Sequence, residues 1–254
     1  MPEELQRITR KLLNFSRELG RPEYRLVILG EGNTSARVDA ETFLVKASGT
    51  QLEHLNEDQV TQVRFDRILP MLDEQLSEEA IEQRLLDARV DPESMKPSVE
   101  TTFHSWLLQQ EGVNFVGHTH PVEVNKILCS DAAPLFAGNR LFPDEIVCCG
   151  PKSLLLDYVD PGSELGGAIR DGWEQFVAEN GFPPKIILIR NHGLIAAGGS
   201  PDAVLVATFM AVKAAEVFNG ARTAGNIQFM DSKDVQRIQN RLDEKYRQKQ
   251  LKVS

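Results

Sequence analysis

The sequence predicts an α/β fold, because helical and strand-like segments alternate along its 254 residues. Apolar residues recur at helical spacing from Pro2 to Leu19, which indicates an amphipathic first helix. Lys185–Arg190 is short and almost wholly apolar, as expected of a buried central strand. Ser200-Pro201-Asp202 is a strong helix start, and the long apolar helix that follows ends near Gly220.

The first half of the chain contains two further strand candidates. Leu26–Leu29 leads into the turn-rich segment Gly30–Ser35, and Phe43–Val45 leads into the small residues Ala47–Thr50. Residues 71–96 are rich in charge, and we interpret them as a surface excursion that carries one short helix.

The second half continues the alternation. Ser98 suits the N-cap of the next helix, and Gly112 suits its end. Val113–His120 is a strand candidate, and Pro121 fits the first turn of the helix after it. We expect residues 221–254 to form a polar, helical tail. We find no linker, so the chain 1–254 is predicted to be a single domain.

Composition narrows the class of function. Hydrophobic residues make up 41% and charged residues 26%, and the net charge is -9. A negative chain is a poor binder of nucleic acid or of anionic membranes, since both require a cationic face. No apolar stretch reaches the roughly 20 residues of a membrane span, and no signal-peptide core opens the chain. The three cysteines lack metal-type spacing, which together with these features predicts a cytoplasmic protein.

Three of the five histidines have the spacing of a metal site. His118 and His120 lie at the end of a strand candidate, and they point the same way because strand side chains alternate. His192 also follows a strand candidate, and sites in α/β proteins gather where strands end. Three imidazoles with an open fourth position are typical of catalytic zinc. We therefore predict zinc, or another divalent metal, at these histidines. His54 stays unassigned, with a surface or loop role expected.

Glu100 has more than one interpretation from spacing alone. Glu100 and His104 are four residues apart on one helix face, so they could form a ligand pair or a general base with its orienting partner. A glutamate in a first helical turn more often serves the helix dipole, with the histidine unrelated to it.

Five motifs resemble, in order, those of the class II aldolase/adducin family, over residues 5 to 220. They are Gly32-Asn33-Thr34-Ser35, Ser48-Gly49, Pro97-Ser98-Val99-Glu100, His118-Thr119-His120-Pro121 and Asn191-His192-Gly193-Leu194. The resemblance implies that His118, His120 and His192 bind zinc, that Glu100 is both ligand and acid/base, and that His104 binds no metal. It also implies a three-layer α/β/α fold whose central sheet is mainly antiparallel, and a homotetramer with sites at subunit interfaces.

The same resemblance assigns a phosphate site to Gly32, Asn33, Ser48, Gly49 and Ser98. Small residues in tight turns expose backbone N–H groups, which suits an anion. Val99 departs from the fuculose-phosphate aldolase pattern, which has a second serine there. Tyr158 lies where that aldolase has a proton-donating tyrosine.

The family resemblance implies a zinc-dependent lyase of carbohydrate metabolism. A ketose, typically a ketose 1-phosphate, would be cleaved through an enediolate to a dihydroxyacetone- or glycolaldehyde-type fragment and an aldehyde. A dehydratase or decarboxylase acting on a sugar phosphate or sugar acid is the alternative, and a ribulose-phosphate 4-epimerase fits less well. A non-catalytic adducin-like protein lacks the metal ligands that this chain retains. A cupin oxygenase also uses an HxH motif but has its glutamate after that motif, whereas Glu100 precedes it in this chain.

Overall fold

The computed structural model describes residues 3–241. Contacts within the chain group it into two units, one of Met1–Thr119 with Val159–Asp171 and one of His120–Tyr158 with Gly172–Ser254. The strands form a seven-stranded sheet in the order β3-β2-β1-β4-β7-β6-β5. The pairs described are antiparallel except for β5 with β6, which confirms the prediction of an α/β fold with a mainly antiparallel sheet. The prediction of a single domain stays a prediction.

The elements of the first unit are α1 (Glu3–Leu19), η1 (Pro22–Tyr24), β1 (Asn33–Arg37), β2 (Thr42–Lys46), η2 (Glu57–Gln59), β3 (Val60–Arg64), α2 (Phe65–Ile68), η3 (Leu69–Leu72), α3 (Glu78–Asp87), α4 (Thr101–Leu107) and β4 (Phe115–Thr119). Those of the second unit are α5 (Val122–Leu128), α6 (Ala133–Gly138), α7 (Pro143–Cys149), β5 (Leu154–Leu156), β6 (Ile186–Ile189), β7 (Gly193–Gly198), α9 (Pro201–Ala224) and α10 (Ser232–Asn240). Helix α8 (Ser163–Asn180) contributes residues to both.

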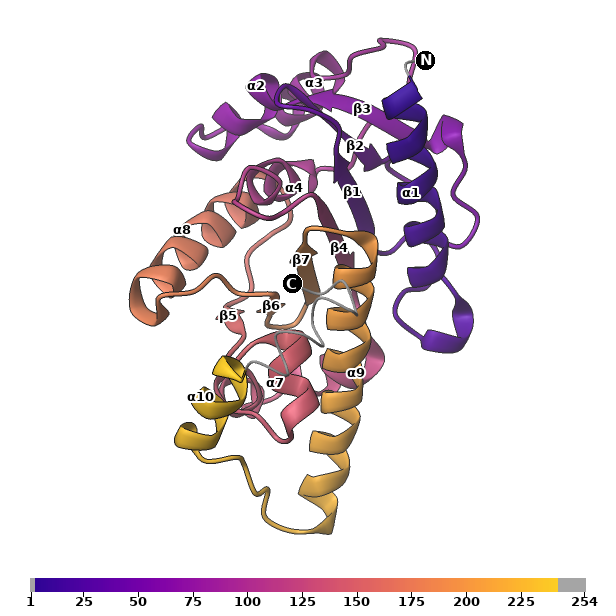
Figure 1. Cartoon of the computed structure of the whole chain (residues 1–254). Helices are drawn as coiled ribbons and strands as arrows, with labels where there is room; N and C mark the ends of the chain where they lie inside the picture. Colours follow the sequence, from indigo (N-terminus) through magenta and orange to yellow (C-terminus); the bar gives the residue numbers. More distant parts are fainter. Residues whose placement is uncertain (1–2, 242–254) are drawn as a thin grey trace. The chain divides into compact units, whose positions relative to one another are not determined.

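The first unit has a helix on each face of its strands (Figure 1). On one face α1 packs against β1, where the Ser16 and Thr34 hydroxyl oxygens lie 2.6 Å apart. On the other face α4 packs, and the Ser35 hydroxyl lies 2.7 Å from Nδ1 of His104. Because successive strand residues point to opposite faces, Thr34 and Ser35 reach different helices.

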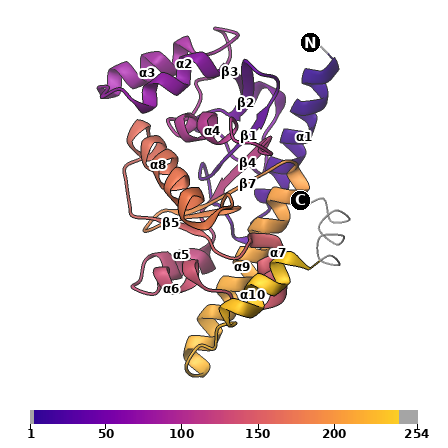
Figure 2. The same cartoon turned by 60° about the vertical axis from the view of Figure 1, so that its left-hand side comes forward.

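The second unit is built around β6 and the long helix α9. All four residues of β6 are buried, as its apolar sequence predicts. Helix α9 packs against β7, α5 and α7, and Figure 2 shows it beside α5, α6 and α7. Its N-cap is Ser200, whose hydroxyl accepts a hydrogen bond from the Ala203 N–H, as predicted, although the helix continues past Gly220 to Ala224. By length and composition alone this helix could cross a membrane, but the buried core helices of soluble proteins have the same properties.

Two predicted boundaries in the first unit are wrong. Leu26–Leu29 is not a strand, since Ile28 and Leu29 are exposed and Leu29 has a φ of +52°. The strand instead begins at Asn33, inside the segment interpreted as turns. Polar residues form this strand because α1 and α4 supply hydrogen-bond partners for them on both faces.

The helix after Pro97 also begins later than predicted. Its N-cap is Glu100 and not Ser98, and it ends at Leu107, before Gly112. Ser98 forms the preceding turn: its carbonyl oxygen accepts from Thr101 N–H at 3.0 Å, and its hydroxyl accepts from Glu100 N–H at 3.3 Å. Pro121 is the N-cap of α5, next to the predicted position.

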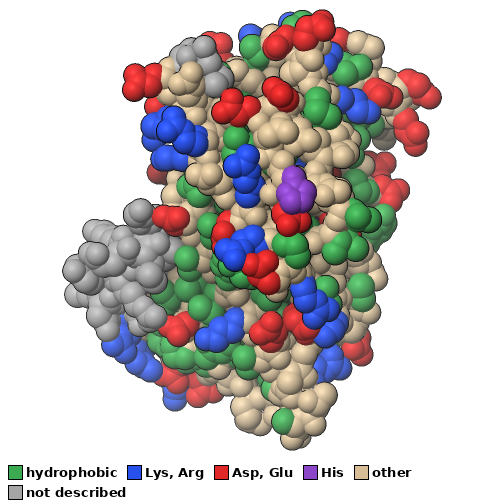
Figure 3. Space-filling view, turned by 90° about the vertical axis from the view of Figure 1, so that its right-hand side faces the viewer, with side chains coloured by type: hydrophobic (Ala, Val, Ile, Leu, Met, Phe, Trp, Pro, Cys, Tyr) green, Lys and Arg blue, Asp and Glu red, His purple; other side chains and the backbone are tan. Residues whose placement is uncertain are grey.

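The charged segment 71–96 carries α3, as predicted, and is tied to the outer strand β3. Arg89 pairs with Val63, and the Val90 N–H donates to the Gln62 carbonyl oxygen at 2.9 Å. In the predicted tail, α10 is helical, while residues 242–254 lie outside the described residues. Lysines and arginines are interspersed with acidic side chains on the face seen in Figure 3, with no broad basic patch among the described residues there.

Candidate active site

The buried carboxylate of Glu100 lies among polar side chains of the first unit. Glu100 is 8% exposed, and its Oε2 accepts a hydrogen bond from Nδ2 of Asn33. Its Oε1 lies 3.5 Å from Nε2 of His118, which is fully buried. Asn33 and His118 face each other directly across the antiparallel pair β1–β4. The pairing of β1 with β4 therefore places the side chains of Asn33 and His118 next to the carboxylate of Glu100, which is the N-cap residue of α4.

His104 lies close to this cluster without joining the other histidines. It is fully buried, is hydrogen-bonded to Ser35 through Nδ1, and stacks on Phe103 with ring centroids 4.5 Å apart. Burial lowers the pKa of His104 to about 3, so its imidazole is neutral. The i,i+4 spacing with Glu100 is thus not a ligand pair, because each side chain has a different partner.

The second unit holds His120 and His192 together. His120 follows β4, and His192 lies in the turn between β6 and β7, where Asn191 has a φ of +54°. The two imidazole rings are 5.0 Å apart between centroids. Nδ2 of Asn125 donates to the His192 carbonyl oxygen at 2.9 Å, which fixes the backbone at this turn.

The three predicted metal ligands form one group. His118 and His120 are separated by a single residue at the end of β4, and the ligand nitrogens of His118, His120 and His192 lie within 4.8 Å of one another. Imidazole nitrogens suit zinc and other divalent transition metals. The donor set therefore fits a metal ion, and this group could hold one.

Three predicted phosphate-binding segments are tied to one another by hydrogen bonds. The ammonium of Lys46 donates to the carbonyl oxygens of Thr50, at 2.7 Å, and Gly30, at 3.4 Å. The Ser48 N–H donates to the Lys96 carbonyl oxygen at 2.9 Å, just before the Ser98 turn. These bonds bring the segments that contain Gly32, Ser48, Gly49 and Ser98 side by side.

Gly32 and Gly49 are glycines for partly different structural reasons. Gly32 has a φ of +73°, and a Cβ there would come within 2.8 Å of the His118 carbonyl oxygen. Gly49 has a φ of +74°, and a Cβ there would meet no described atom within 4 Å. The strain of a positive φ applies to both, but only Gly32 is also needed for a close approach of two backbones.

Sequence reasoning missed three residues that support the site: Lys46, Ser35 and Asn125. Lys46 is 2% exposed, and burial lowers its pKa to about 8 against the opposing attraction of Glu100. A lysine that ends the apolar run Phe43–Val45 was a signal that could have identified it. Ser35 and Asn125 had none, because their partners are distant in sequence.

Two other predicted residues lie at the surface. Tyr158, the predicted proton donor, follows β5 and is 53% exposed. His54 is exposed and lies 3.5 Å from the Glu53 carboxylate, as expected of a surface histidine.

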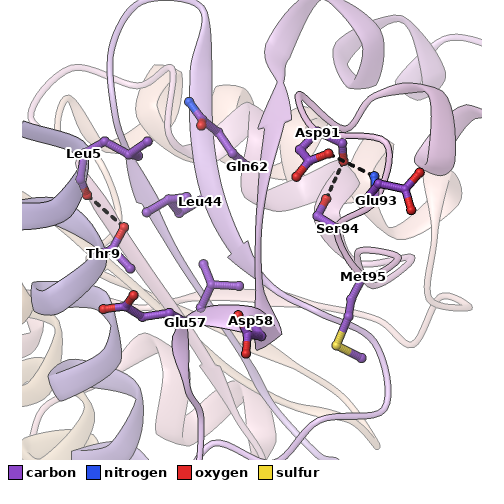
Figure 4. A pocket seen from close by; sticks show the side chains of 11 residues that line it. Leu5, Thr9, Leu44, Glu57, Asp58, Gln62, Asp91, Glu93, Ser94 and Met95 are labelled. Atoms are coloured by element: carbon purple, nitrogen blue, oxygen red, sulfur yellow. Dashed lines mark hydrogen bonds between the residues drawn. The ribbon is translucent and has the colours of Figure 1, made fainter. Parts of the chain in front are cut away.

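A separate cavity of about 580 Å³ lies on the α1 face of the first unit (Figure 4). Leu44 and Gln62, which are cross-strand partners on that face, form part of its wall together with Leu5 and Thr9 of α1. None of its described lining residues belongs to the cluster around Glu100. The candidate active site is therefore distinct from this cavity.

The comparison with protein families identifies one family over most of the chain. Residues 10–218 match the Class II Aldolase and Adducin N-terminal domain family, and the chain belongs to that family. Class II aldolases are typically metal-dependent, and the three-histidine group of this chain could hold a metal ion. A search of curated proteins finds no significant match.

Solved structures share the fold. The N-terminal class II aldolase domain of a conserved Thermoplasma acidophilum protein is 25% identical, with a TM-score of 0.64, and the match covers 82% of this chain and 92% of that one. An L-fuculose 1-phosphate aldolase is 14% identical, with a TM-score of 0.69 and coverage of 95% and 96%. YgbL from Escherichia coli, provisionally assigned as an aldolase, epimerase or decarboxylase, is 17% identical, with a TM-score of 0.67 and coverage of 92% and 99%.

Proposed function

We propose that this protein is a zinc-dependent aldehyde-lyase that cleaves a ketose 1-phosphate to a dihydroxyacetone- or glycolaldehyde-type fragment and an aldehyde. The observation that carries the proposal is the grouping of His118, His120 and His192, with Glu100 against His118. Family membership supports lyase chemistry at this place, since the family includes sugar-phosphate aldolases.

His118, His120 and His192 would hold the metal, with Glu100 as a further ligand until substrate binds. A bound divalent metal supplies Lewis-acid stabilisation of the negative charge that develops on the ketose oxygens. Glu100 moves a proton at the carbon next to the carbonyl, and a buried carboxylate that is held from both of its oxygens suits that role.

The phosphate would bind in the loops that contain Gly32, Ser48, Gly49 and Ser98. Support comes from their mutual hydrogen bonds and from Lys46, whose ammonium gives this side of the unit a positive charge. Tyr158 is the proposed proton donor to the aldehyde oxygen. We further propose a single domain, a homotetramer, and a place in cytoplasmic carbohydrate metabolism, by likeness to the family.

A substrate screen with product analysis tests the proposal. Metal-loaded protein is incubated with ketose 1-phosphates, with their unphosphorylated forms and with sugar acids. Release of an aldehyde, strongest from a ketose 1-phosphate and abolished by a chelator, is the expected result. Loss of water without an aldehyde would overturn it in favour of a dehydratase, and release of carbon dioxide would favour a decarboxylase.

A further inference from the structure

Asn33 contacts a group that its predicted role does not explain. As a phosphate ligand it should turn its amide toward the glycine loops. Its Nδ2 instead donates to Oε2 of Glu100, which is 67 residues away in the sequence, and both side chains are buried. The hydrogen that it donates to Glu100 is not available to a phosphate.

The backbone around Asn33 leaves this amide little freedom. Asn33 is paired with His118, and the two residues that follow it, Thr34 and Ser35, are hydrogen-bonded to α1 and α4 on opposite faces. Gly32, just before it, lets the chain pass within contact of the His118 backbone. The amide is thus placed by strand pairing and by both neighbouring helices.

The two oxygens of Glu100 consequently face different groups. Oε2 is occupied by Asn33, while Oε1 faces the His118 ring at 3.5 Å. We propose that Asn33 is a positioning residue that fixes the Glu100 carboxylate, so that one oxygen is directed toward His118, one of the proposed metal ligands. This inference rests on the proposed function. It assigns Asn33 to the acid/base group instead of to the phosphate site.

Such an orienting hydrogen bond has measurable consequences. Partners that orient metal ligands typically contribute about 10–100-fold in metal affinity or activity. Asn33→Ala should therefore lower kcat by about 10–100-fold, to the same extent on phosphorylated and unphosphorylated ketoses. It should also weaken Co²⁺ binding, which is followed by the visible spectrum without any substrate. Asn33→Asp, which has the same shape without the N–H donor, should have at least as large an effect on kcat.

Asn139→Ala is the matched control, because the Asn139 amide donates only to the carbonyl oxygen of Leu135 in the described structure. It should leave kcat and Co²⁺ binding unchanged. Circular dichroism checks that each variant folds. A rise in KM confined to phosphorylated substrates, with kcat and Co²⁺ affinity as in the wild type, would return Asn33 to the phosphate site and overturn the proposal.

A second measurement needs neither substrate nor metal. The side-chain amide signals of Asn33 in ¹⁵N NMR spectra of the intact metal-free chain should shift in Glu100→Gln, while those of Asn139 should not. Unmoved Asn33 signals would overturn the contact even if the enzyme is active. If Glu100→Gln shifts the Asn33 signals but the wild-type chain binds no metal and cleaves no ketose, the proposed function is overturned and the contact stands.

Discussion

The two faces of β1 bury polar side chains in different ways. On the α1 face, Thr34 meets a hydroxyl, that of Ser16, which itself donates to the Leu12 carbonyl oxygen at 2.6 Å. On the α4 face, Asn33 meets a carboxylate and Ser35 meets an imidazole. All of these residues are buried.

The difference shows that a buried, hydrogen-bonded polar residue is not by itself a functional signal. A hydroxyl pair stabilises the fold and changes no charge. Buried ionisable groups oppose folding unless they are paired or neutral, as the lowered pKa of His104 shows. The α4 face therefore retains groups that cost stability, which is expected of a reactive site.

The largest expected effect is that of Glu100→Gln on the α4 face. Loss of a positioned acid/base group typically costs about 10²–10⁴-fold in rate. The variant should still bind a metal through the three histidines but lose deuterium exchange on the ketone-type fragment in D₂O, measured by NMR. Exposed Glu93→Gln serves as the control and should exchange normally. Undiminished exchange by Glu100→Gln would remove Glu100 from the proton transfer.

His104 should make the protein sensitive to acid. Its pKa is about 3 in the folded chain and 6.5 when unperturbed, so between these values only the unfolded chain binds the proton. The free energy of unfolding should therefore fall as the pH drops from 6.5 toward 3, by about 2 kcal/mol at pH 5 from this group alone.

Urea titrations at pH 7 and pH 5 measure this loss of stability. His104→Gln should lose less stability between the two pH values than the wild type does, and exposed His54→Gln should lose as much. Equal losses in the wild type and His104→Gln would show that another group causes the acid sensitivity.

The smallest effect on catalysis is expected on the α1 face. Ser16→Ala leaves the buried Thr34 hydroxyl without its partner, which should lower the free energy of unfolding by about 1–3 kcal/mol. Because Ser16 contacts no residue of the candidate site in the described structure, kcat and KM should not change. A fall in kcat as large as that of Asn33→Ala would mean that the two faces are not functionally distinct.

The sequence predicted the parts of this molecule that local patterns determine. The apolar run of β6, the Ser200 cap of α9 and the HxH motif all follow from spacing between neighbouring residues. The start of β1 did not, because its polar residues are buried by α1 and α4, whose contacts no local pattern reveals. For the same reason the contact between Asn33 and Glu100 could not be predicted, and Asn33 was assigned through family resemblance to the phosphate.

The claim that three histidines hold one metal ion can be tested directly by metal titration of the chelator-treated chain, with the bound ion quantified after dialysis. We predict one zinc ion per chain in the wild type, and loss of tight binding in folded His120→Ala and His192→Ala. A wild-type chain that retains no metal, or a His192→Ala variant that binds zinc as tightly as the wild type, would contradict the account.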